Sequence, residues 1–284
     1  MKKTFRFTIL VLALLMMLCS CNGEGENVSQ QPESNVSDVT KTPQKLLLYQ
    51  EKIFDMETET YYYDSYGVLT ESKIEIADGQ VLTCKYAYDA FGNKISETTY
   101  EENGEVREES KWTYNEKGLL IEFVDGRLAQ TTKYTYDDQN RISTRTENEI
   151  YLYYYTYDED GNYTVQPDGY MAMLYYTKDG ELYKIYDDNG DLATDSEFDE
   201  NGNMITQTNY ADGEKPYFVS NYEYNDNNQV IKQTYYNNDK LSGTTVYEYD
   251  EFGNLLKIKS IDPLGKETVS REYVYKYFPV EEKE

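Results

Sequence analysis

Carboxylates are the most abundant side chains in this sequence that could perform chemistry. The 284-residue chain has 53 Asp and Glu against 27 Lys and Arg, and it has no histidine. The lack of histidine excludes Ser-His and Cys-His catalysis and the commonest zinc ligand. Two carboxylates suffice to cleave a glycoside, so a glycoside-cleaving enzyme remains an alternative. We nevertheless expect a protein that is not an enzyme, because many acidic residues recur at equivalent turn positions: Asp64, Asp89, Asp137, Asp158, Asp199 and Asp250.

Three of the turns alternate oxygen-bearing side chains as a calcium-binding loop does. They are Asp158-x-Asp160-Gly-Asn162, Asp187-x-Asn189-Gly-Asp191 and Asp199-x-Asn201-Gly-Asn203. Their glycine stands at the fourth position instead of the sixth, and no glutamate stands reliably at the twelfth. The pattern therefore favours plain hairpin turns. We expect no metal site and no cofactor, with weak calcium binding as the alternative.

Tyrosine, with 33 copies, is the other residue that could act on a ligand. Adjacent tyrosines on one strand point to opposite faces of a sheet, so a single buried face cannot hold them all. Exposed rings can stack on sugars or anchor a protein interface. The alternative is a structural role, as tyrosine ladders that hold the sheet together. The candidates for ligand stacking are Tyr151, Tyr153, Tyr154, Tyr175 and Tyr176.

A repeated stretch, Tyr-x-Tyr-Asp-x-x-Gly-Asn, must position these residues, and it is clearest at residues 86–93 and 247–254. Its two tyrosines share one face of a strand, while Asp and Gly-Asn supply turn chemistry and a left-handed backbone position. Successive copies are mostly 21 to 26 residues apart. The longer gap between Tyr157 and Phe198 should hold two short units, with Tyr186, Asp187 and Gly190 as the intermediate copy. We assign a structural turn role to Asp64, Gly67, Asp89, Gly92, Asn93, Asp137, Asp158, Gly161, Asp199, Gly202, Asp250, Gly253 and Asn254.

A second turn signal lies between successive copies, for example at Asp78-Gly79, Asn103-Gly104 and Asp262-Pro263-Leu264-Gly265. Asn-Gly and Asp-Gly between alternating apolar stretches are strong hairpin signals, because both central residues of the favoured turn need positive φ. Each unit is therefore two strands and two turns. The sequence predicts an all-β fold, an antiparallel array of about ten YD-type β-hairpins, named for the Tyr-Asp pair of the motif, that forms a meandering, curled or spiral sheet. The period and the turns are the same in a spiral, a barrel and a sandwich, so they do not separate these three.

The same motif resembles the YD repeat of Rhs proteins and their relatives. The resemblance covers roughly residues 58 to 278 and rests on six or more copies in register. In that family the repeats form an antiparallel sheet that winds into a spiral or hollow shell, often around a C-terminal toxin. Since the last repeat is followed by a few residues only, the resemblance implies the fold unit without a toxin domain.

The N-terminus has the pattern of a bacterial lipoprotein signal. Lys2, Lys3 and Arg6 precede an apolar run of twelve residues, and Leu18-Cys19-Ser20-Cys21 resembles a lipobox. We expect residues 1–20 to be a signal peptide and Cys21 to carry the lipid, with an ordinary cleaved signal as the alternative. Residues 21–44 should form a disordered acylated tether, 45–280 the repeat domain and 281–284 a tail. The protein should thus be exported and anchored by lipid to the cell membrane or the outer membrane.

The charge balance limits the partners. Removing residues 1–20 removes three basic residues, which leaves 24 against 53 and a net charge of −29. Such a surface disfavours nucleic acid, and the lipid anchor is the one membrane contact that we expect. The partner should be an extracellular protein or a glycan. Cys84 would be left alone by lipidation of Cys21, which rules out an intramolecular disulfide framework. We expect a surface-anchored lipoprotein with a non-enzymatic repeat module for binding or envelope structure, with a carbohydrate-binding module as the alternative.

Overall fold

The computed structural model describes residues 44–211 and 213–281. Cys21, the signal peptide and nearly all of the expected tether and tail lie outside these ranges. Within them no helix is long and apolar enough to cross a membrane. The described residues form twenty strands: β1 (Gln44–Ile53), β2 (Glu57–Tyr63), β3 (Leu69–Ile76), β4 (Val81–Tyr88), β5 (Lys94–Tyr100), β6 (Val106–Tyr114), β7 (Leu120–Asp125), β8 (Gln130–Tyr136), β9 (Ile142–Glu147), β10 (Tyr151–Tyr157), β11 (Tyr163–Pro167), β12 (Met173–Tyr176), β13 (Leu182–Tyr186), β14 (Leu192–Phe198), β15 (Met204–Tyr210), β16 (Pro216–Tyr224), β17 (Val230–Asn237), β18 (Lys240–Tyr249), β19 (Leu255–Ile261) and β20 (Glu267–Pro279).

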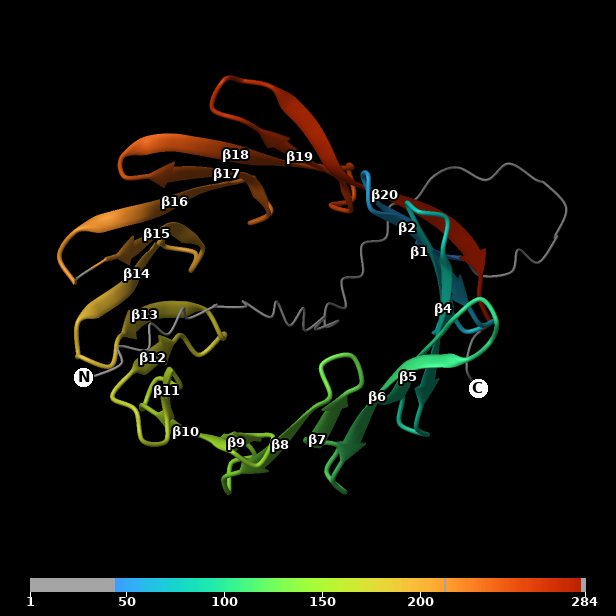
Figure 1. The fold of residues 1–284 in the computed structure, drawn as a ribbon, viewed down its shortest axis with the longest axis horizontal. Coiled ribbons are helices and arrows are strands. Elements are labelled where there is room, and N and C mark those ends of the chain that lie inside the picture. The colour runs from blue at the N-terminus through green and yellow to red at the C-terminus, as the bar shows by residue number, and fades with distance from the viewer. Residues whose placement is uncertain (1–43, 212, 282–284) are drawn as a thin grey trace, which may run out of the picture. The chain divides into compact units, whose positions relative to one another are not determined.

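The twenty strands form one closed antiparallel ring. Each strand pairs with the next along the chain, and β20 pairs with β1 from Gln44 opposite Pro279 to Ile53 opposite Arg271. Figure 1 shows this closure, with the red C-terminal strand beside the blue N-terminal strands. The prediction of an all-β antiparallel array is therefore confirmed. The prediction of a meandering or spiral sheet was wrong, because pairing of β1 with β20 closes the curled sheet into a barrel.

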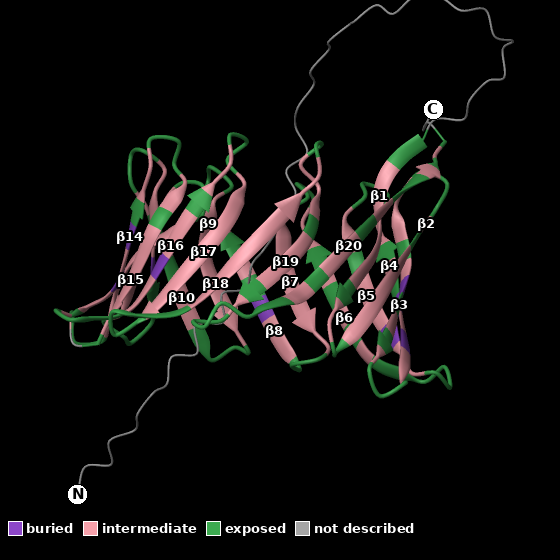
Figure 2. Cartoon of the chain, turned by 90° about the horizontal axis from the view of Figure 1, so that it is seen from above, coloured by how far each residue is buried: buried purple, intermediate pink, exposed green. Residues whose placement is uncertain are grey.

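The turns gather at the two ends of the ring, which we call the first and the second rim. Figure 2 shows the tilted strands between the two rims and exposed residues in many of the turns. The first rim carries the nine turns that follow β2, β4 and every second strand up to β18, and also the ends of the ring at Gln44 and Pro279. The second rim carries the remaining turns, beginning with the one between β1 and β2.

The ring is wide and its wall is one sheet thick. Closing twenty tilted strands at the usual strand spacing gives a diameter of roughly 35–40 Å between opposite backbones, and barrels of 16–18 strands already leave an open channel. Leu82, Cys84 and Val165 are the buried hydrophobic residues among those described. The interior is therefore not a packed core, and stability must come from contacts between neighbouring strands.

Candidate functional site: the inner wall and the YD turns

The nine first-rim turns share one hydrogen-bond pattern. In each of them the N–H of the first residue donates to the carbonyl of the fifth, and the N–H of the fourth donates to the carbonyl of the first. An aromatic residue ends the strand before every one of these turns. The nine pairs are Tyr63-Asp64, Tyr88-Asp89, Tyr114-Asn115, Tyr136-Asp137, Tyr157-Asp158, Tyr176-Thr177, Phe198-Asp199, Tyr224-Asn225 and Tyr249-Asp250.

The Asp side chain at the start of such a turn binds the turn's own backbone. In one example, Asp89 Oδ1 accepts the N–H groups of Phe91 and Asn93 at 2.9 Å, while Oδ2 accepts the side-chain amide of Asn93 at 2.9 Å. The Asn93 amide, together with backbone N–H groups, lowers the pKa of Asp89. Gly92 stands at φ 86°, a left-handed conformation in which glycine carries no steric cost. These carboxylates therefore serve as turn acceptors.

The acceptor role recurs at the other predicted turn carboxylates. Backbone N–H groups two and four residues further on donate to Oδ1 of Asp64, Asp137, Asp158, Asp199 and Asp250. Gly67, Gly161, Gly202 and Gly253 take the left-handed position, and Asn254 donates its amide to Asp250 Oδ2 at 2.8 Å. The described residues hold no group of three or more His, Cys, Asp or Glu suited to a metal ion. Weak calcium binding at these turns stays a prediction.

The intermediate repeat unit lies at a different place from the one predicted. Tyr176, Thr177 and Gly180 form the first-rim turn between β12 and β13, and the hydroxyl of Thr177 accepts the N–H of Glu181 at 3.1 Å. The turn that follows Tyr186 lies at the second rim, so the assignment of Tyr186, Asp187 and Gly190 as the intermediate copy was wrong. The sequence motif misses this unit because a threonine replaces the usual Asp or Asn.

The second tyrosine of the motif ties neighbouring strands together. In two units its hydroxyl donates to the carbonyl of the first residue of the preceding strand, from Tyr136 to Leu120 at 2.6 Å and from Tyr157 to Ile142 at 3.0 Å. In these two cases the ladder between the two strands begins two residues further on, at Glu122 and at Thr144. The side chain thus supplies a donor where the backbone ladder has ended. Four further tyrosines bind backbone carbonyls at equivalent places: Tyr63, Tyr114, Tyr224 and Tyr249.

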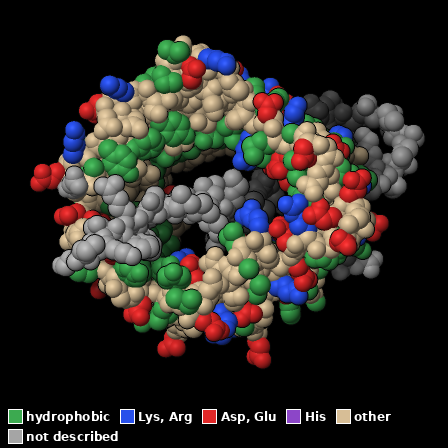
Figure 3. Space-filling view, viewed as in Figure 1, with side chains coloured by type: hydrophobic (Ala, Val, Ile, Leu, Met, Phe, Trp, Pro, Cys, Tyr) green, Lys and Arg blue, Asp and Glu red, His purple; other side chains and the backbone are tan. Residues whose placement is uncertain are grey.

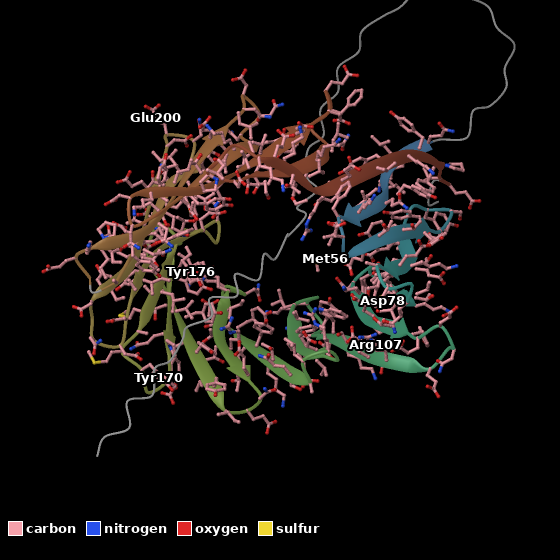
Figure 4. All side chains as sticks on the ribbon, turned by 45° about the horizontal axis from the view of Figure 1, so that its top comes forward. Met56, Asp78, Arg107, Tyr170, Tyr176 and Glu200 are labelled. Atoms are coloured by element: carbon pink, nitrogen blue, oxygen red, sulfur yellow. The ribbon has the colours of Figure 1, made fainter. Side chains whose placement is uncertain are left out.

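The tyrosine face of the sheet lines the inside of the ring. Strand β4 shows the two faces. Its inner face carries Leu82, Cys84, Tyr86 and Tyr88, and the residues between them include the exposed Lys85 and Ala87. Figure 3 shows hydrophobic side chains around much of the inner edge and acidic and basic side chains mainly around the outside. Figure 4 places Tyr176 on the inner side of the wall and the turn residue Glu200 at its outer edge. The inner wall is therefore an aromatic surface that the side chains of residues 44–211 and 213–281 leave open.

The five tyrosines predicted to stack on a ligand lie on different faces. Strand alternation puts Tyr153 and Tyr176 on the inner face, and Tyr154 and Tyr175 on the outer face. The Arg145 guanidinium lies 4.2 Å from the Tyr153 ring centre, and Tyr176 stacks on Tyr163 at 4.9 Å. Tyr175 packs edge-on against Tyr186. These three rings already contact other side chains. Tyr151, at the second-rim end of β10, is 49% exposed, and Tyr154, on the outer face of β10, is 44% exposed.

A polar cluster lies on the inner wall where the ring closes, and the sequence motif did not single it out. Glu51 of β1 stands opposite Glu59 of β2, and the Tyr61 hydroxyl lies 3.3 Å from a carboxylate oxygen of Glu51 and 3.0 Å from one of Glu59. Arg271 of β20 pairs with Glu51 at 2.8 Å. Burial raises the pKa of Glu59, as do the charges of Glu51 and Glu57, against the lowering effect of nearby hydroxyls. No signal marks Glu51 in the sequence, because β1 carries no copy of the repeat.

A hollow of about 380 Å³ lies near the second rim between β17 and β20. Small hydroxyl residues line it, including Ser242, Thr245, Ser260 and Thr268, and the Tyr235 ring borders it. Tyr235 stands opposite Gly243 of β18, which has no side chain to cover the ring, while the Tyr235 hydroxyl lies 3.2 Å from the Thr245 hydroxyl and the Phe218 ring centre lies 6.1 Å from that of Tyr235. The Tyr235 hydroxyl bonds Gln233 Oε1 at 2.8 Å, which fixes the ring in place.

Comparison with known proteins assigns the ring to a family. The family model of the Teneurin YD-shell matches residues 34–263, most of the chain. The chain belongs to the Teneurin YD-shell family. The YD-repeat resemblance in the sequence is thereby confirmed, and the turns and tyrosine ladder described above are the repeat of a YD-shell. No curated protein matches this YD-shell chain in sequence.

Solved structures resemble the YD-shell ring more distantly. A crystal structure of TcdB2-TccC3-Cdc42 is 14% identical with a TM-score of 0.35, over 78% of this chain and 16% of that one. The YD-shell chain thus spans about a sixth of that relative. A crystal structure of a porin-like protein from Bacteroides uniformis ATCC 8492 is 11% identical with a TM-score of 0.41, over 84% of this chain and 98% of that one. Likenesses at this level carry no argument about function.

Proposed function

We propose that this YD-shell is an exported, lipid-anchored protein whose ring binds a partner without enzymatic chemistry. The observation that carries the proposal is the half-exposed aromatic inner wall of a closed ring. Tyrosine offers a large contact area at low cost in conformational entropy, and its hydroxyl can bind polar groups of a partner. An interior of this width admits a polypeptide or polymer chain and brings it against aromatic rings on several strands.

The anchor is part of the proposal. Cys21 would carry the lipid, and 22 residues would separate it from Gln44 at the first rim. Mass analysis of the N-terminal peptide from membranes tests this part. A Cys21 that carries a diacylglyceryl group on its sulfur and an acyl chain on its amino group has a distinct mass. An unmodified peptide that begins elsewhere would contradict the anchor and leave the binding ring to be tested by itself.

Binding at the inner wall is tested by photocrosslinking in intact cells. A photoreactive phenylalanine derivative is placed at Tyr235 on the inner wall and, as the matched control, at the outward-facing Tyr154, which is 44% exposed. We expect crosslinked adducts from the inner position and none from the outer one. Adducts from Tyr154 alone, or from neither position, would contradict an inner binding wall.

The non-enzymatic part rests on the use of the carboxylates. Those at the YD turns accept backbone N–H groups, so the pair Glu51 and Glu59 is the arrangement best suited to acid/base chemistry. We expect purified protein to leave cell-surface polysaccharides uncleaved. Cleavage that is abolished by Glu59→Gln would overturn the assignment and make this pair catalytic.

Carbohydrate is a second candidate ligand, and the hollow beside Tyr235 favours it. A fixed aromatic ring next to several hydroxyl side chains matches the stacking and hydrogen bonding that sugars use. The test is a glycan array with the chain from residue 44 onward, run for the wild type, for Tyr235→Ala and for Tyr154→Ala. Binding that Tyr235→Ala abolishes and Tyr154→Ala retains would support the candidate. Binding that both variants retain would contradict this site.

A further inference from the structure

The third position of the first-rim turns breaks the repeat in one sector of the ring. All nine turns have the same backbone hydrogen bonds, so nothing in the turn itself demands an aromatic residue there. Six turns have a polar or charged residue at this position, and three have an aromatic one. The polar set is Lys117, Gln139, Asp160, Asp179, Asn201 and Asn227, and the aromatic set is Tyr66, Phe91 and Phe252.

The three aromatic turns are neighbours on the rim. Phe252 lies between β18 and β19, then β20 and β1 follow around the ring, then Tyr66 between β2 and β3 and Phe91 between β4 and β5. The end of β20 joins this sector, because the N–H of Glu281 donates to the carbonyl of Ser65 at 2.6 Å. Tyr277 near that end is 62% exposed. We call Tyr66, Phe91, Phe252 and Tyr277 the aromatic arc.

The arc is strongly exposed. Phe91 is 91% and Phe252 is 73% exposed, at a turn position where the six other first-rim turns carry polar or charged residues. Two exposed lysines, Lys45 on β1 and Lys276 on β20, lie in the same sector. Aromatic rings accompanied by lysines are the composition that settles at the boundary between lipid headgroups and acyl chains.

The position of the chain entry identifies the surface that the arc meets. Gln44, where β1 begins, pairs with Pro279 at the first rim, so residues 1–43 join the ring inside the sector of the arc. We propose that the aromatic arc rests on the lipid surface to which the N-terminus is anchored. This proposal rests on the proposed lipid anchor and adds that the ring stands on the membrane with its first rim. Because the chain is strongly acidic, the contact depends on the rings and the two lysines instead of on net charge.

The test places tryptophan at the arc and measures its contact with acyl chains. The chain from Cys21 to Glu284 is coupled through Cys21 to a maleimide lipid in phosphatidylcholine vesicles whose acyl chains carry bromine, a quencher of tryptophan fluorescence. Cys84 is 3% exposed and is shielded from the coupling. Trp112→Tyr removes the native tryptophan, and tyrosine stands at the equivalent place in most other units, such as Tyr86 and Tyr134.

The probes are Phe91→Trp and Phe252→Trp, with two matched controls. Asn201→Trp occupies the same turn position on another sector of the first rim, and Leu264→Trp replaces a residue that is 95% exposed at the second rim. We expect brominated lipid to quench both arc probes and neither control. Equal quenching at all four sites, no quenching at the arc, or stronger quenching of Leu264→Trp would overturn the proposal. Chemical coupling makes the result independent of natural acylation, which the mass of the N-terminal peptide tests separately.

Discussion

The tyrosine ladder makes a prediction about stability that a matched pair of substitutions can test. Tyr136→Phe removes one hydroxyl that donates to the Leu120 carbonyl at 2.6 Å and changes little else. Tyr88 stands at the equivalent place on β4, and no hydrogen bond of its hydroxyl is present among the described residues. Tyr88→Phe therefore removes the same atom without removing a ladder contact.

We expect Tyr136→Phe to lower the free energy of unfolding by about 1–2 kcal/mol, since a net hydrogen bond is lost and a carbonyl is left without its donor. For a domain of this size that corresponds to a fall in melting temperature of roughly 2–8 °C. Tyr88→Phe should stay within about 0.5 kcal/mol of the wild type. Urea unfolding followed by circular dichroism and by Trp112 fluorescence measures both variants.

Equal costs for the two substitutions would refute the ladder reasoning, because they would show that the loss comes from the ring environment and not from the bond to Leu120. The two probes also serve as a control. In a repeat array the units can unfold separately, and disagreement between the probes would restrict the comparison to the sector that contains Trp112.

Three further predictions concern the turns and the closure. Asp250→Ala should lower the melting temperature, whereas Glu251→Ala in the same turn should not. Because the pKa of Asp250 is lowered in the folded protein, the difference in melting temperature between Asp250→Ala and wild type should shrink as the pH falls below the normal Asp range. Gly92→Ala should lower the free energy of unfolding in urea by about 1–2 kcal/mol, because residue 92 has a left-handed backbone conformation. Gly92→Asn should lower it less, since asparagine adopts φ 62° in the equivalent turn at Asn140. Equal losses for the two variants would contradict this prediction. Because the pKa of Glu59 is raised in the folded protein, its ionisation destabilises the fold as the pH rises above the normal Glu range. Glu59→Gln should therefore raise the melting temperature at pH 7 relative to wild type and have little effect at pH 4. The same shift in melting temperature at both pH values would contradict this prediction.

The strands and turns could be predicted from the sequence because both are local. Alternating side chains and Asp-x-x-Gly spacing determine a hairpin within about ten residues, as at Asp89 and Gly92. Thr177 shows the limit of the motif, since its hydroxyl takes over the acceptor role of Asp and gives no motif match. A search for any aromatic residue followed by a side-chain acceptor and a glycine three residues later would have found this unit.

Closure of the ring could not be predicted, because it depends on a strand without the motif. β1 has a plain apolar and charged sequence, and its pairing with β20 joins Glu51 to Arg271 across 220 positions of the chain. The two faces of the tyrosine strands pose a similar difficulty. The sequence shows that the side chains of Tyr153 and Tyr154 point to opposite faces of one strand. Which of the two faces the interior follows only from the direction in which the sheet curves.

The pairing of β1 with β20 also determines how the chain can reach its folded state. The other described strands pair with neighbours that follow after one turn, so their loops close quickly and can form as the chain is synthesised. Until β20 is complete, the growing sheet has two unpaired edges that could join another chain, and the last pairing removes both at once. Slowing the formation of β20 should therefore favour dimers with exchanged edges, and the ring, once closed, should resist such exchange.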